Sequence, residues 1–213
     1  MRRVPVLLAF AVCACHGGAD GAAPTPPTTA SPTQAPTPAD PAALVLRAAD
    51  LSGGRRTDAR TIPRVSFLPC GPTSQIDVPE ARGAEAVVNT RGDNVSEAVY
   101  AFPDAAAAHA RVATLITALK SCPTFPRQVT VGGKHVPDVV MRRRPYPGLR
   151  YGDESYVYSE TGTIPGIGLD RMVFVVARVG AVVVDVSVDI DTERDDAAVD
   201  AAARAAVERA RTG

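Results

Sequence analysis

The side chains that could carry out acid–base or nucleophilic chemistry are few in this sequence and lie far apart. There are three histidines, His16, His109 and His135. A catalytic triad needs a nucleophile, a base and a group that orients the base, and the chain contains no Gly-x-Ser-x-Gly, His-x-x-x-His or Cys-x-x-Cys pattern. The sequence therefore predicts no catalytic residue, no metal ligand and no cofactor, and His109 is interpreted as a half-buried packing residue on a helix.

Two segments match part of the sequence pattern of a known ligand site but lack residues or the structural context that the site needs. The acidic run from Asp189 to Asp195 resembles the start of a calcium loop, but Arg194 and Asp200 stand where that loop needs glycine and glutamate. It is interpreted as the acidic start of a helix. The glycine-rich segment 162–168 joins two predicted strands instead of a strand and a helix, so it is predicted to be a hairpin loop and not a phosphate site.

The densest basic patch is Arg142, Arg143 and Arg144, with Arg150 close behind. It could contact an anionic envelope polymer or lipid head groups; the alternative is a solvated strand end. The whole chain has 23 basic and 23 acidic residues. That balance gives no global field that would attract nucleic acid, so no nucleic-acid partner is expected.

The N-terminus has the layout of an export signal. Arg2 and Arg3 precede a short apolar run that is too short to span a bilayer. The run ends in Val12-Cys13-Ala14-Cys15, which resembles a bacterial lipobox with Cys15 as the modified residue. Residues 1–14 are thus predicted to be a lipoprotein signal peptide, and acylated Cys15 to anchor the protein at the extracytoplasmic face of the cell membrane. The alternative is an ordinary signal peptide, cut near Ala19 or Ala23.

Residues 15–41 form a predicted stalk. Seven prolines fall between Pro24 and Pro41, among Thr, Ser and Ala, and no larger aliphatic residue accompanies them. Such a segment cannot build a core, so we expect a disordered spacer with polyproline-II character. The folded domain is predicted to span residues 42–213.

Two cysteines remain in that domain, Cys70 and Cys122. In an exported protein a disulfide between them is the default expectation. Closing a loop of about fifty residues would stabilise the fold by roughly 4 kcal/mol. A reactive or metal-binding thiol pair is the alternative.

The periodicity of apolar residues predicts helices and strands in an α+β order. Helices are expected at 41–51, 103–121 and 193–211, and strands at 84–89, 95–102, 129–131, 138–143 and 154–159, with 52–82 irregular. Strands joined by short connections favour a twisted antiparallel sheet with helices packed mainly on one face and one disulfide.

The segment Arg171–Ile190 is predicted to form two central strands. Apolar residues alternate with Asp185, Ser187 and Asp189 in its second half, whereas its first half is apolar on both faces. The first strand must therefore be covered on both sides, by helices on one and by a loop or ligand on the other. A ligand cleft is expected at Met172, Phe174 and Val176.

Several short motifs also carry a resemblance to a known family. They are Ala49-Asp50-Leu51, Cys70, Phe102 to Ala106, Ser121-Cys122-Pro123, Gly152 to Ser155 and Val176 to Val184. Over roughly residues 42–211 the sequence resembles the PknH-like extracellular sensor domain of actinobacterial receptor kinases and stand-alone lipoproteins. The resemblance implies a twisted antiparallel sheet, helices on one face and a ligand cleft linked to envelope sensing, without catalysis. Two departures are a single disulfide where the kinase sensor carries two, and no kinase domain or spanning helix in this sequence.

The expected function is thus that of a lipid-anchored, non-catalytic protein. Its domain is predicted to bind a small molecule, a lipid, an envelope polymer or an envelope protein. One alternative is a hydrolase or transferase acting on envelope components, which would need polar, titratable residues to converge in the cleft, such as His135 with Asp153 or Glu154. Another is a purely structural wall-proximal protein.

Overall fold

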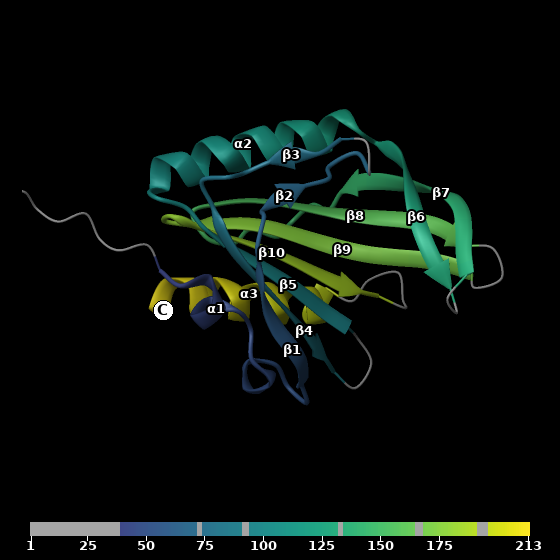
Figure 1. Ribbon diagram of the computed structural model, residues 1–213. Coiled ribbons are helices and arrows are strands. Elements are labelled where there is room, and N and C mark those ends of the chain that lie inside the picture. Colours follow the sequence, from purple (N-terminus) through teal and green to yellow (C-terminus); the bar gives the residue numbers. More distant parts are fainter. Residues whose placement is uncertain (1–38, 72–73, 91–93, 132–133, 165–167, 191–195) are drawn as a thin grey trace, which may run out of the picture. The chain divides into compact units, whose positions relative to one another are not determined.

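A single antiparallel sheet organises the part of the chain that the computed structural model describes, residues 39–71, 74–90, 94–131, 134–164, 168–190 and 196–213. Its eight strands lie in the order β1-β4-β5-β10-β9-β8-β7-β6 (Figure 1). Their bounds are β1 Arg55–Ile62, β4 Arg82–Asn89, β5 Asn94–Ala101, β6 Thr124–Val131, β7 Lys134–Pro145, β8 Glu154–Ile164, β9 Gly168–Val179 and β10 Val182–Asp189.

The two strands predicted in Arg171–Ile190 are confirmed as the centre of this sheet. β9 and β10 form a hairpin in which Val179 pairs with Val182. Gly180 makes the turn with a φ of 56°, a left-handed conformation that glycine adopts without a steric penalty. Because side chains alternate along a strand, Val184 and Val186 face one core of the protein while Val183 faces the other.

The helices divide between the two faces of the sheet. α3 (Asp196–Thr212) and the short α1 (Pro41–Leu44) share one apolar core with β9 and β10, and α2 (Ala105–Ser121) packs into a second core on the opposite face (Figure 1). The α+β class is confirmed, and two of the three described helices share one face of the sheet. The other face is covered by α2, so that Val175 and Val176 in the first half of the hairpin are both buried, each in a different core.

Helix α2 forms because its sequence supplies both a cap and an apolar stripe. The Asp104 side chain accepts a hydrogen bond from the Ala107 amide at 2.8 Å, as an N-cap should. Ala108, Val112, Leu115 and Leu119 are buried along the stripe. His109 lies beside the stripe but its side chain is 61% exposed, with Nδ1 2.7 Å from a Glu154 carboxylate oxygen. Its predicted packing role is wrong, because the carboxylate holds the ring at the surface.

The segment 52–82, predicted to be irregular, holds three strands. β1 forms one edge of the main sheet, and β2 (Ser66–Phe67) pairs with β3 (Ile76–Asp77) in a separate ribbon. β1 has the polar sequence RRTDARTI, and a polar edge strand carries little of the alternation that marks a half-buried one. The predicted loop at 162–168 is also partly strand, since Ile164 pairs with Gly168; residues 165–167 and 191–195 lie outside the described ranges.

Candidate functional site

A cavity of about 360 Å³ opens on the α2 face of the sheet. Its floor comes from β8, β9 and β10, its roof from the last two turns of α2, and its side wall from residues 67–71 and β6. Most of its lining is aromatic or aliphatic, with four charged groups. The lining residues are Phe67, Leu68, Pro69, Gly71, Leu115, Leu119, Phe125, Arg127, Arg143, Tyr158, Glu160, Phe174, Val176 and Asp185.

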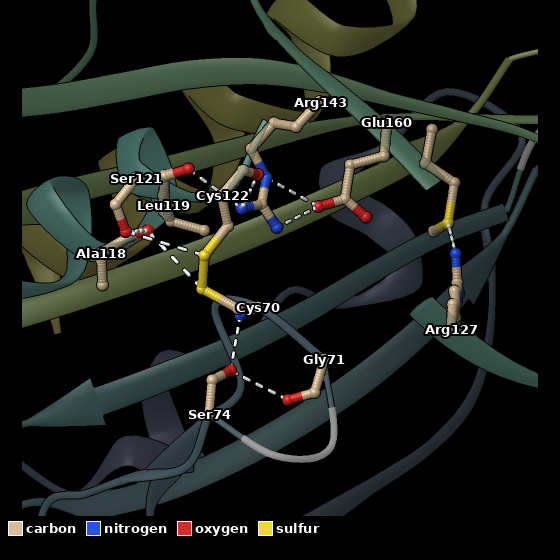
Figure 2. Close-up of polar contacts among 11 residues, drawn as sticks. Cys70, Gly71, Ser74, Ala118, Leu119, Ser121, Cys122, Arg127, Arg143 and Glu160 are labelled. Carbon is tan, nitrogen blue, oxygen red and sulfur yellow. Dashed lines mark hydrogen bonds and ion pairs between the residues drawn. A yellow bond between two sulfur atoms is a disulfide. The ribbon is translucent and has the colours of Figure 1, made fainter. Parts of the chain in front are cut away.

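The side wall is fastened by the predicted disulfide, which is confirmed between Cys70 and Cys122 with Cα atoms 5.6 Å apart. Cys122 caps the C-terminus of α2, so the bond ties the wall to the roof (Figure 2). Within the wall, the Cys70 amide donates to the Ser74 hydroxyl at 2.6 Å, and that hydroxyl donates to the Gly71 carbonyl at 2.9 Å. The cavity therefore depends on a covalent link between segments 52 residues apart.

Gly71 is required where the wall meets β6. Its φ is 85°, and a Cβ at this position would lie 2.5 Å from the Pro126 carbonyl oxygen. A larger residue would combine backbone strain with a backbone clash, which would push the wall away from β6.

Arg143 is the polar centre of the site. Its side chain is 4% exposed and meets the Glu160 carboxylate, 7% exposed, with Nη2 and Nε at 2.6 Å and 3.0 Å from Oε1. Its Nη1 donates to the carbonyls of Leu119 and Cys122 at the end of α2, at 3.1 Å and 3.3 Å (Figure 2). One guanidinium thus joins β7, β8 and the helix C-terminus, where a cation is favoured by the helix dipole.

Aromatic rings enclose the same guanidinium. Its central carbon lies 4.6 Å from the Phe125 ring centre and 4.9 Å from that of Tyr158, distances at which cation–π attraction operates. Tyr158 in turn stacks on Phe174 at 5.0 Å. Burial raises the pKa of the Tyr158 hydroxyl well above its ordinary value, so that hydroxyl stays neutral.

Asp185 is the remaining acidic group of the cavity floor. The structure shows no hydrogen bond or ion pair for its carboxylate among the described residues. Loss of water contact, and then the nearby Glu160 carboxylate, raise its pKa to about 7. The group therefore changes charge near neutral pH.

Comparison with known proteins identifies a similar fold. No family model and no curated protein matches the sequence. Among solved structures, the chain is similar to the extracellular domain of PknH from Mycobacterium tuberculosis, with 19% sequence identity and a TM-score of 0.57, over 83% of this chain and 99% of that one. The chain has the fold of the PknH extracellular domain. The resemblance predicted from short motifs is thus confirmed in three dimensions.

Within this PknH-like fold, the predicted ligand residues fall into two groups. Arg143, Phe174 and Val176 line the cavity. Met172 does not, although its sulfur lies 3.5 Å from Nη1 of Arg127, which does. Ligand binding by any of them stays a prediction.

The basic patch is split by the alternation of β7. Arg142 and Arg144 are exposed and lie outside the cavity lining, while Arg143 between them is buried. The interpretation of all three as a solvated strand end is therefore wrong for Arg143, because it faces Glu160 directly across the β7–β8 pair.

The sequence patterns do not identify the two acidic residues of the cavity, Glu160 and Asp185. The alternation in β10 predicts a solvent-exposed face for Asp185, but a second core beneath α2 covers that face. The predicted strand 154–159 ends one residue before Glu160, which lies in β8. By contrast, Leu115 and Leu119 belong to the predicted helix stripe, a signal that could have located the roof.

The residues that a hydrolase would need are not brought together. Asp153 and Glu154 both pair with Arg178, at 3.2 Å and 3.3 Å. In the antiparallel β7–β8 pair, Arg142 lies opposite Thr161. From that pair, β7 runs back to His135 toward one end of the sheet, and β8 runs back to Glu154 toward the other end. His135 is therefore far along the sheet from Asp153 and Glu154.

Within the described residues, every helix is too short or too polar to cross a lipid bilayer. Cys15 lies outside those residues, and its acylation and the predicted stalk stay predictions.

Proposed function

We propose that this protein is a lipid-anchored, extracytoplasmic binding protein whose cavity takes a small, largely apolar envelope molecule or lipid. The observation that carries the proposal is the cavity itself, about 360 Å³ with mostly apolar walls and a few convergent polar groups. Natural ligand sites have this size and character, roughly 300 to 1,000 Å³. Its fold, shared with the extracellular domain of a kinase, supports a location outside the cytoplasm.

The chemistry of the lining favours binding over catalysis. The described lining contains no Ser, Thr, Cys, His or Lys, which are the usual nucleophiles and many of the usual bases. The buried Arg143 is held by the Glu160 carboxylate and by helix carbonyls, which suits a rigid wall. An envelope protein or polymer could reach the same opening, and ligand binding is the role that the cavity supports best.

A neutral apolar probe tests the binding proposal. Leu68 lines the cavity and is 52% exposed, whereas Val140 is 63% exposed and lies outside its lining. N-Phenyl-1-naphthylamine is expected to gain fluorescence on binding, and Leu68→Ser to weaken its affinity roughly three- to tenfold, because part of one leucine contact is lost. Val140→Ser is the matched control and should bind like the parent. No saturable binding, or an equal loss in both variants, would refute the proposal.

Membrane fractionation tests the anchor. Cys15→Ala is expected to move the protein from the membrane pellet to the soluble fraction, because stable anchoring needs about two acyl chains and the variant has none. Cys13→Ala is the control, since it leaves the modified cysteine in place, and it should stay in the pellet. Retention of Cys15→Ala in the membrane would show that another feature holds the protein there.

A further inference from the structure

Asp185 brings a negative charge to the cavity without a matching cation. We propose that the cavity selects amphipathic cations, molecules with an apolar body and one protonated amine or guanidinium group, with the cation held against Asp185. This inference rests on the proposed binding function and names the chemistry of its ligand.

The two arginines of the lining do not neutralise this carboxylate. Arg143 directs its nitrogens to Glu160 and to two carbonyls at the end of α2, and the Phe125 and Tyr158 rings lie 4.6 Å and 4.9 Å from its central carbon. Arg127 directs Nη1 to the sulfur of Met172. Among the described residues, the structure shows no ion pair between either arginine and Asp185.

The groups that face Asp185 are apolar, neutral or acidic on each packed strand. Its cross-strand partners are Val176 on β9 and Ala98 on β5. Tyr100 on β5 and Tyr158 on β8 are both neutral phenols whose pKa is raised by burial and then by Asp185. Glu160 on β8 adds a like charge. A cation held against Asp185 is therefore attracted by two carboxylates, while the two lining arginines contact Glu160, the α2 carbonyls and Met172.

The apolar part of the ligand has its own partners beside that charge. Phe67, Leu115 and Phe174 line the same cavity, and aromatic faces attract alkylammonium groups in addition to burying hydrocarbon. An anionic lipid would instead need a free guanidinium, and the Arg143 donors are directed at protein acceptors.

Three matched probes separate charge from hydrophobicity: octylammonium, octanol and octanoate, titrated calorimetrically into the folded protein at pH 8. Octylammonium is expected to bind most tightly and octanoate most weakly. Asp185→Asn should weaken octylammonium binding roughly ten- to a hundredfold, as when one partner of a desolvated charge pair is removed, while octanol changes by less than about threefold. Asp189→Asn removes the same charge from the same strand but from outside the lining, and it should bind all three probes like the parent.

The outcomes distinguish this inference from the proposed function. Tighter binding of octanoate, or octylammonium binding that is insensitive to Asp185→Asn, would overturn the cation selectivity and leave the cavity as a binding site. Loss of selectivity together with a failure of N-phenyl-1-naphthylamine to bind would overturn both. Octylammonium affinity that falls as the pH is lowered through about 7, where Asp185 takes up its proton, supports the inference; a flat profile in the parent contradicts it.

Discussion

Arg143→Leu is expected to lower the free energy of unfolding by about 3 to 5 kcal/mol, the cost of leaving one member of a buried ion pair unpaired. Glu160 would remain buried at 7% side-chain exposure without its cation. The carbonyls of Leu119 and Cys122 would also lose their donor. Urea unfolding at pH 7 with the disulfide intact measures the change.

Two further variants show whether the ion pair is the cause. Arg144→Leu removes an exposed arginine from the same strand, and a surface change of this kind should stay within about 0.5 kcal/mol. In Arg143→Leu/Glu160→Leu the uncompensated carboxylate is gone, so much of the loss should be recovered. A double variant as unstable as the single one would assign the effect to the lost helix contacts and ring packing, and not to the buried charge.

Much of the fold follows from short-range pattern. The stripe of α2 and the alternation in β10 are periodicities of 3.6 and 2 residues, and each indicates its element without reference to the rest of the chain. The disulfide follows from composition, because Cys70 and Cys122 are the two cysteines of the folded domain. Local sequence therefore decides a large part of this architecture.

The cavity depends on information that a linear pattern does not contain. Arg143 is buried and Arg144 exposed because of the register that puts Arg143 opposite Glu160, and nothing in a run of three arginines distinguishes them. The polar positions of β10 lie in solvent only if no other element packs on that face of the sheet. Here α2 packs on it. The alternation therefore predicts the strand correctly but predicts the wrong environment for Asp185.

The cavity wall illustrates the same limit. Residues 67–71 have no periodic pattern, and they become a wall only because Cys70 is bonded to the end of α2. The sequence nevertheless predicts a cleft at β9, because a strand that is apolar on both faces must pack against other elements on both faces. α3 packs on one face and α2 on the other. The cavity lies on the α2 face, beside Phe174 and Val176.

Asp185→Asn is expected to make the protein more stable at pH 8, by on the order of 2 to 4 kcal/mol. Burial raises the pKa of Asp185 to about 7 in the folded protein, from an ordinary value of 3.8. A raised pKa means that the folded state binds the proton more tightly. The stability associated with that proton is fully present below about pH 3.8 and is lost as the pH rises through about 7. Asparagine carries no charge to desolvate, so the variant avoids this loss.

The pH dependence identifies the carboxylate as the cause of that gain. The difference in unfolding free energy between Asp185→Asn and the parent should be large at pH 8, smaller at pH 6 and close to zero at pH 4. Asp189→Asn, on the same strand but outside the cavity lining, should not reproduce the gain at pH 8. A gain that is constant across this range would mean that packing, and not charge, separates the variant from the parent. A gain that fades toward pH 4, joined to a loss of octylammonium binding, would show that a destabilising carboxylate is kept on the cavity floor because it holds the ligand.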